Sequence, residues 1–511
     1  CTDPGEDIRA DGVETHTISV AGNVSHASVK GFEADLTVVM NGTGTQTVTT
    51  SGTGWLGDLR ISNTSGEVQL GATLLVGDDI TVDANTVFDL VSYGITGTVS
   101  TAWTNNGTVQ LTGDQTFTNA TPTNNAGSTV EYMATSGSRA IKDWTYQSLK
   151  INGAGGTFTM GAGEVLGENL TVTAGTLNAN TQTLAINGNT TINGGTFQTG
   201  TNTITFGNAA GDSVTISSGE LQIQSDSTTV DIVKTASTWT NSGGTITYNC
   251  ATGVSTTLRT ALSPYNHLIV NSSGSTYSLD NPGITVNGDL TITAGTLSTS
   301  AQSLPITVGG NWTNATGTFT PNSGTVTFNG SGTQTLISGG TGTGKQFNNI
   351  VKSAAGTVNI TTNDVYAGGT VTVSGGTFAT KGYELTSVGA LTVSSGTLDG
   401  TDTGGEGDTS YIYVGGSVDF TGGDYTEATS TIVMNGTGST TFTSASEALN
   451  NLTINDGLVG YWKLDEASAN LCTGGVNDSC DSSGYGNDGA WSGTNIAASS
   501  TVPTLKFSNS R

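Results

Sequence analysis

Short runs of four to six residues in which apolar and polar side chains alternate recur along most of this chain. Leu290 and Ile292, then Leu304, Ile306 and Val308, are typical. Gly or Asn-Gly interrupts the runs every seven to twelve residues, and both residues tolerate the positive φ of tight turns. Alternation with a period of two is the signature of β-strands, and no segment before residue 457 sustains a helical period of 3.6. The sequence therefore predicts an all-β fold.

A pair of sequence elements occurs five times in a fixed order. The first copy reads LTVVMNGTGTQTV from residue 36, followed by GDLRISNTSGEVQL from residue 57. Positions equivalent to Leu59 are Leu149, Leu268, Ile350 and Leu452, at spacings of 90, 119, 82 and 102 residues. A third element, such as GDLTITAGTLSTSAQSLPI from residue 288, follows three of the pairs. The preserved order indicates irregular modules that have gained and lost turns.

Two architectures fit such repeats. An antiparallel sandwich needs compact hairpins and a closed core for each domain, whereas a parallel β-helix stacks like residues on like residues. The ordered recurrence of GTV, GTF and GTL favours stacking. Over residues 36–456 the chain resembles the parallel β-helix repeats of bacterial and archaeal surface proteins and secreted adhesins. At roughly 20 to 25 residues and about 4.8 Å per turn, we expect a rod of about 80 to 100 Å.

The predicted domains are an N-terminal segment or cap, an elongated parallel β-helix (β-solenoid) and a C-terminal segment of different character. Their ranges are 1–35, 36–456 and 457–511. We divide the solenoid into modules at about 36–128, 129–244, 245–324, 325–430 and 431–456.

The net charge of −26, with only 14 Lys and Arg, makes nucleic acid an unfavourable partner. No run of about 18 apolar residues exists, so we expect no membrane span. Acidity of this kind suits the solubility of a long extracellular body, and Ca²⁺ binding is the alternative. The carboxylates that could hold Ca²⁺ lie in a Gly-rich insertion and near the C-terminus: Asp399, Asp402, Glu406, Asp408, Asp481 and Asp488. An exposed acidic loop and turn chemistry are the simpler interpretations, and we predict no other cofactor.

Catalytic patterns are scarce. His16, His26 and His267 have no Ser-His-Asp or H-E-x-x-H context. Asp78, Asp79 and Asp83 form the one dense carboxylate group within a module, and a solvated turn explains them as well as a polysaccharide lyase or hydrolase does. We predict a protein that is not an enzyme, with no catalytic residues.

Three tryptophans begin similar strands, at Trp103, Trp239 and Trp312. Exposed Trp rows bind sugar rings by stacking. The equivalent position is Thr190 in one copy and Val418 in another, which favours a variable packing position.

The cysteines suggest an oxidising compartment. Cys472 and Cys480 enclose a short polar loop that a disulfide could close, and we predict that pair. Cys250 lies in a strand-like run, where a buried free thiol is expected.

The composition and the repeat pattern of the sequence change at residue 457. GLVGYWKLDEASAN, followed by DSSGYGNDGAWSGT from residue 481, resembles the opening of a laminin-G-like, concanavalin-type jelly-roll domain. The apolar strand would contain Val459, Tyr461, Trp462 and Leu464. Such a sandwich needs about 150 residues, and 55 follow from residue 457 to residue 511, so we expect an incomplete β-sandwich segment.

These features predict a non-enzymatic structural protein of the cell surface or extracellular space. The β-solenoid subunit would assemble head-to-tail with copies of itself into a filament or layer, through its open end and its incomplete C-terminal segment. The alternative is an adhesin stalk that presents a laminin-G-like head to glycans or other surface proteins. A polysaccharide-cleaving enzyme is the third and least favoured hypothesis.

Overall fold

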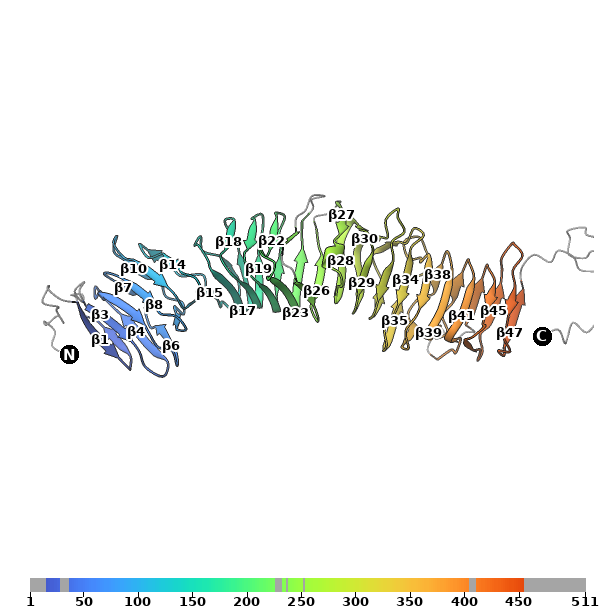
Figure 1. Ribbon diagram of the computed structural model, residues 1–511, viewed down its shortest axis with the longest axis horizontal. Coiled ribbons are helices and arrows are strands. Elements are labelled where there is room, and N and C mark those ends of the chain that lie inside the picture. The colour runs from blue at the N-terminus through green and yellow to red at the C-terminus, as the bar shows by residue number, and fades with distance from the viewer. Residues whose placement is uncertain are drawn as a thin grey trace, which may run out of the picture.

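The computed structural model describes residues 15–27, 36–225, 232–235, 238–250, 253–403 and 410–454. These residues form a long parallel β-solenoid of about 20 turns, which confirms the predicted fold class (Figure 1). The chain passes from one end of a slightly bowed rod to the other. At about 4.8 Å per turn the rod measures roughly 95 Å, within the expected range. The one helical element in the described ranges is the 3-10 turn η1 (Thr260–Leu262).

The N-terminal part has three faces, each built by strands of successive turns. The first face contains β1 (His16–Val20), β3 (Leu36–Met40), β5 (Asp58–Ile61), β8 (Ile80–Val82), β11 (Trp103–Asn105) and β14 (Pro122–Asn124). The second contains β2 (Val24–His26), β4 (Gln46–Thr50), β6 (Glu67–Leu70), β9 (Val87–Asp89), β12 (Thr108–Leu111) and β15 (Thr129–Tyr132). The third contains β7 (Leu74–Val76), β10 (Ile95–Gly97) and β13 (Phe117–Thr118). Pairing already includes β1 and β2, which precede the predicted start of the solenoid at residue 36.

In the middle part, long strands bend through a corner and contribute to two faces. They are β17 (Ser148–Thr159), β19 (Leu170–Asn178), β21 (Thr190–Gln198) and β23 (Ser213–Ile223). The remaining face contains β18 (Glu164–Leu166), β20 (Leu184–Ile186), β22 (Ile204–Phe206) and β24 (Ile232–Lys234). The flanking strands are β16 (Ser138–Ala140), β25 (Thr238–Asn241), β26 (Thr245–Tyr248) and β27 (Ser255–Leu258).

The C-terminal part continues the same plan. Its first strands are β28 (His267–Leu279), β29 (Ile284–Val286), β30 (Leu290–Ser298), β31 (Ile306–Val308), β32 (Trp312–Thr313), β33 (Thr318–Thr320), β34 (Thr325–Phe328), β35 (Thr333–Ile337), β36 (Asn349–Lys352) and β37 (Thr357–Ile360). Two long strands then alternate with short ones: β38 (Val365–Ala367), β39 (Val371–Ala379), β40 (Leu385–Ser387), β41 (Leu391–Asp399), β42 (Tyr411–Val414), β43 (Val418–Asp419) and β44 (Asp424–Thr426). The last described strands are β45 (Thr431–Met434), β46 (Phe442–Thr443) and β47 (Asn451–Ile454).

A single hydrophobic core runs inside the rod, from Val38 to Met434. Alternate residues of each strand point into it, as the burial of Leu36, Val38 and Met40 in β3 illustrates. Turn length varies from 19 residues, between paired Trp103 and Pro122, to 28 residues, between Ile204 and Ile232. The strands stay in register because the extra residues enter the loops at the corners.

Glycine makes the bend of the long strands possible. Gly175 has φ +76°, and a Cβ built on it would lie 2.2 Å from the carbonyl oxygen of Gly153 one turn away. Gly219 repeats this relation with the carbonyl of Gly195, at 2.4 Å. Only glycine fits a positive φ and such a close approach of backbones, which explains the glycine that opens the GTL or GTF triplets at residues 175, 295, 376 and 396.

Another corner is stabilised by a ladder of Asn and Asp side chains. The Asn169 Oδ1 accepts a hydrogen bond from the backbone N–H of Asn189 (2.9 Å), and the Asn189 Oδ1 accepts one from Ser213 (2.8 Å). In a later module, Asp289 caps Asn311 in the same way at 2.7 Å. Each side chain satisfies a backbone donor of the next turn, which the sheet ladder leaves unpaired at the corner. We call this arrangement the corner ladder.

The repeated elements of each module stack on one another in consecutive turns. The residues equivalent to Leu59 pair with the matching residue of the preceding element: Val38 with Leu59, Val130 with Leu149, Ile246 with Leu268, Val326 with Ile350, and Ile432 with Leu452. The opening strand of a module does not continue the face on which the previous module opened. Thus β15 stacks on β12, β26 on β23, β34 on β31, and β45 on β42. Successive modules are therefore rotated about the rod axis by one face.

Candidate functional site

The acidic group near the N-terminal end has the same arrangement as the corner ladder. Carboxylate oxygens of Asp58, Asp78 and Asp79 lie within 4.8 Å of one another. The Asp58 carboxylate accepts hydrogen bonds from the Thr37 hydroxyl (3.0 Å) and the Asp79 N–H (2.9 Å). The Asp79 carboxylate accepts one from the N–H of Ala102 (3.0 Å). Two of the three acids therefore have a structural use as corner caps.

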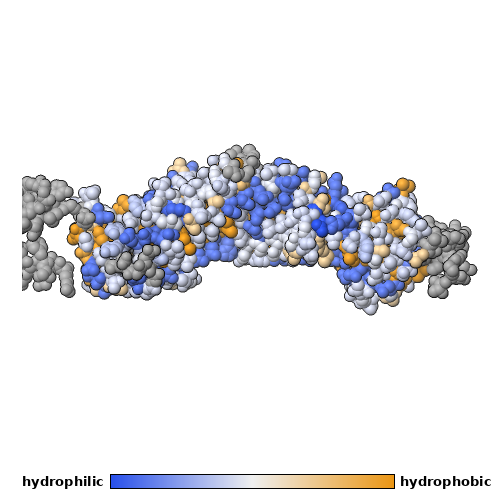
Figure 2. All heavy atoms as spheres, turned by 180° about the vertical axis from the view of Figure 1, so that it is seen from behind, coloured by the Kyte–Doolittle hydropathy of each residue, from blue (hydrophilic) through white to orange (hydrophobic). Residues whose placement is uncertain are grey.

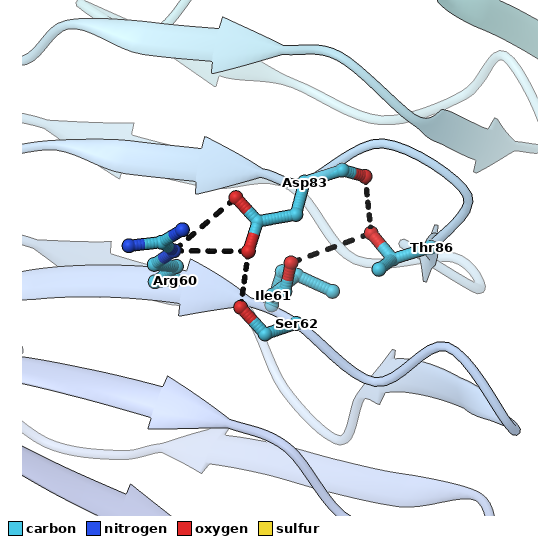
Figure 3. A network of polar contacts seen from close by, with 5 residues as sticks. All are labelled: Arg60, Ile61, Ser62, Asp83 and Thr86. Carbon is cyan, nitrogen blue, oxygen red and sulfur yellow. Dashed lines mark hydrogen bonds and ion pairs between the residues drawn. The ribbon is translucent and has the colours of Figure 1, made fainter.

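Asp83 does not join this group, although the sequence placed it with Asp78 and Asp79. Its carboxylate accepts hydrogen bonds from the Nε–H of Arg60, at 2.9 Å, and from the hydroxyl of Ser62 (Figure 3). The Thr86 hydroxyl donates to the backbone carbonyl of Asp83 at 2.7 Å, which closes the turn. The expected group of three neighbouring carboxylates is thus replaced by Asp58, Asp78 and Asp79, because Asp58 enters from the preceding turn.

The predicted Ca²⁺ ligands fall into two groups. Asp399 ends β41, where its Oδ1 accepts the N–H of Thr401 at 2.9 Å in a side-chain turn, and Asp402 follows it. Glu406, Asp408, Asp481 and Asp488 lie outside the described residues. Ca²⁺ binding by this set stays a prediction.

All three similar tryptophans point inward, and two of them are fully buried. Trp103 is 1% and Trp312 0% exposed, and Trp312 packs edge-on against Phe319 with centroids 4.9 Å apart. Thr190 and Trp239 occupy one continuous inward row, through Val214. The interpretation as a packing position is confirmed for Trp103 and Trp312, whose rings cannot stack on a sugar.

Cys250 is buried, as predicted: it is 6% exposed, and its backbone N–H donates to the Tyr277 hydroxyl at 3.2 Å. The predicted disulfide of Cys472 with Cys480 lies outside the described residues. So does the predicted assembly strand with Val459, Tyr461, Trp462 and Leu464. These residues stay predictions.

Sequence reasoning missed two buried tyrosine pairs at module junctions. The hydroxyls of Tyr132 and Tyr146 lie 2.9 Å apart, and Tyr146 donates to the carbonyl of Lys142 at 2.6 Å. Tyr248 and Tyr265 repeat the arrangement, with hydroxyls 3.1 Å apart. Burial raises the pKa of Tyr248 to about 12, so its hydroxyl stays protonated at neutral pH. The hydroxyls of each pair hydrogen-bond the backbone of a long loop and hold it against the core.

A buried acid lies near the first tyrosine pair. Glu164, at the start of β18, is only 9% exposed. Burial, reinforced by the negative charge of Asp143, raises its pKa to about 7. In contrast, Glu131 is buried but paired with the Lys150 ammonium at 2.9 Å. Hydrogen bonds from Gln110, Lys150 and Asn152 outweigh burial there and lower the pKa of Glu131.

The two ends of the described solenoid expose inward-facing residues that continue the rows of core side chains. We call these rows the core row. In β47, Leu452 is 38% and Ile454 67% exposed, while the paired Ile432 is fully buried. Within the described ranges β47 pairs with β45 on one side only. At the other end, Ile18 of β1 is partly exposed. Apolar surface, in orange, is visible next to the grey atoms at the C-terminal end, on the left of Figure 2.

Tyrosines gather on the outer face of β38, β40 and β42. We define the tyrosine surface as Tyr366, Tyr411 and Tyr413 with the adjacent acids Asp364 and Glu384. The strand parity places these side chains outward, because Val365, Leu385 and Ile412 between them are fully buried. That parity, visible in the stretch YIYV, is the signal that could have identified the surface from sequence.

Among the residues that the structure describes, there is no helix with the length and apolar character that crossing a bilayer requires. Comparison with known proteins gives no match, since no protein family, curated sequence or solved structure is significantly similar to this chain.

Proposed function

We propose that this protein is a non-enzymatic structural subunit of an extracellular filament or surface layer, in which β-solenoid rods add head to tail. The supporting observation is the exposed core row at the described ends, with Leu452 and Ile454 at one end and Ile18 at the other. Every internal turn buries this row against its neighbour. A second copy that stacks on β47 would bury it in the same way and would pair the free backbone groups of that strand.

The geometry of such a contact is heterologous, because the C-terminal end of one rod meets the N-terminal end of the next. A contact of that kind leaves one free end of each type after every addition and so propagates without closing. The predicted assembly strand in residues 457–511 would add to this contact. The high negative charge would keep single rods soluble and limit side-by-side aggregation.

The proposal is tested by negative-stain electron microscopy and sedimentation of the full chain over a range of protein concentrations. We expect end-to-end fibres of rod width at high concentration. Ile454→Lys places a charge in the core row of β47 and should abolish the fibres, since an inward charge blocks strand addition. Thr453→Lys is the matched control, because its side chain points outward from the same strand. Single rods at all concentrations, or equal loss of fibres in both variants, would refute end-to-end assembly.

The contribution of the C-terminal segment is tested separately with Trp462→Ala. If that segment contributes to the contact, fibres should form only at higher protein concentration. Unchanged assembly would remove residues 457–511 from the proposal and leave the contact with β47.

An adhesin stalk is the second candidate, favoured by the two laminin-G-like motifs at residues 457–466 and 481–489. The rod would then hold a binding head away from the cell. Glycan binding that is lost with residues 457–511, in a protein that remains a single rod, would support this role over filament formation.

A further inference from the structure

The tyrosine surface differs from the rest of the outer surface in its chemistry. Outward positions in other strands are mostly Thr, as at Thr372 of β39 and Thr392 of β41. Here three tyrosines lie within a few turns, and Tyr411 is 36% exposed. Val388, beside β40, is 45% exposed and adds apolar area. Exposed tyrosine offers a flat apolar ring together with a hydroxyl, the combination that stacks on and hydrogen-bonds sugars.

The register fixes the spacing of the rings along the rod. Tyr366 pairs with Thr386, and Thr386 pairs with Tyr413, so the two tyrosines occupy one outward row on alternate turns. Two strand spacings separate them by about 9.6 Å. This distance is close to the length of one disaccharide in an extended β-linked polysaccharide, whose alternate rings present the same face. Thr386 lies between the two tyrosines in this row.

Two carboxylates border this row. The Asp364 Oδ1 accepts the N–H of Glu384 at 2.8 Å, and Glu384 lies next to Tyr411 in the adjoining row by continuation of the register. Burial raises the pKa of Tyr413, and the negative charges of Glu384, Tyr411 and Asp364 raise it further. This effect agrees with the short distance at which the register places these groups from Tyr413. Carboxylates accept hydrogen bonds from sugar hydroxyls. Their charge, with the net charge of −26, repels acidic polysaccharides.

We propose that the tyrosine surface binds an extended, neutral, β-linked polysaccharide that runs along the rod axis. The ring of Tyr413 stacks on that of Tyr411, with centroids 5.9 Å apart, and so leaves its other side to a sugar. Tyr366 and Tyr413 then contact alternate sugars, and Tyr411 with the two carboxylates contacts hydroxyls at one edge of the chain. This binding is independent of end-to-end assembly, because the surface lies on the side of the solenoid. It gives a structural rod a means of attachment to a polysaccharide matrix.

The test uses the full chain with insoluble cellulose and soluble xyloglucan as neutral probes and polygalacturonate as an acidic probe. We expect retention by a neutral probe and none by polygalacturonate. The double variant Tyr366→Ala with Tyr413→Ala should bind at least about tenfold more weakly, since it removes both stacking rings. The double Phe variant should retain most of the binding, because the rings remain. Thr372→Ala, an outward change on another face, is the matched control.

Several results would overturn the proposal. They are no binding to either neutral probe, unchanged binding by the double Ala variant, or equal loss in Thr372→Ala. Side-by-side dimers of rods that the double Ala variant abolishes, without any polysaccharide retention, would assign the surface to a second copy of the chain instead. The assembly variant Ile454→Lys should bind polysaccharide normally, so that failure of the filament proposal and failure of this one are distinguishable.

Discussion

Replacement of Glu164 by Gln should stabilise the solenoid above neutral pH and leave it unchanged in acid. Glu164 is 9% exposed, and burial beside Asp143 raises its pKa from 4.5 to about 7. A carboxyl whose folded pKa is raised destabilises the folded state where it is charged. That penalty is complete above pH 7, shrinks as the pH falls from 7 to 4.5, and is absent below 4.5.

The size of the effect follows from the pKa difference of about 2.5 units. At about 1.36 kcal/mol per unit, the upper limit is about 3.4 kcal/mol. Water still reaches part of the side chain, so we expect about 1 to 2 kcal/mol at pH 8. Gln keeps the shape and removes the charge, so the variant should lack the pH-dependent penalty.

A local assay is required because a solenoid does not unfold as a single two-state unit. Hydrogen exchange by mass spectrometry, corrected for the intrinsic pH dependence, can compare peptides that cover β18 and β20 with distant peptides that cover β39 and β41. We expect Glu164→Gln to increase protection of the first set about five- to thirtyfold at pH 8 and not at pH 4.5. Equal protection at pH 8, a gain at pH 4.5, or the same change in the distant peptides would refute the reasoning.

Three further predictions concern stability. Trp312→Ala should destabilise the turns around β30 to β35 by about 3 to 5 kcal/mol, because it empties a fully buried site. The loss is measured as reduced hydrogen-exchange protection of peptides from these turns. Gly175→Ala should cost more than about 2 kcal/mol by the same measurement, whereas Gly161→Ala, with no atom within 4 Å of the added Cβ, should change little. Tyr265→Phe removes a hydroxyl that donates to the carbonyl of Arg259 at 2.6 Å, and should cost about 1 to 3 kcal/mol of local stability around η1. Unchanged protection near β28 in Tyr265→Phe would mean that the tyrosine pair does not secure the loop.

Much of the fold follows from the sequence, because repeated elements occupy equivalent places in the stack of turns. The positions aligned by repetition, such as Leu59 and Leu149, pair with equivalent residues one turn earlier. What repetition does not determine is the face on which each module begins. All three faces share the same alternation of apolar and polar residues, so a rotation by one face leaves the sequence pattern unchanged.

The candidate sites were harder to predict because neighbours in space come from different turns. Asp58 joins Asp79 across 21 residues, whereas Asp83, four residues from Asp79, lies with Arg60. The tyrosines illustrate a second difficulty. Tyr132 and Tyr248 occupy inward positions of their strands and Tyr411 an outward one, a difference that only strand parity reveals.

Each turn of a solenoid contacts only its neighbours, so the free energy of adding a turn is similar inside the rod and at its end. An exposed core row at β47 is therefore a surface that the fold itself makes complementary to another turn. The sides differ from the ends, because their outward residues do not form the core and can vary with less effect on stability than inward residues. Residues proposed to bind a ligand, such as Tyr366 and Tyr413, can therefore accumulate at these outward positions. In such a rod, the ends would determine assembly and the sides would determine attachment, and Ile454→Lys together with the double tyrosine variant separates the two.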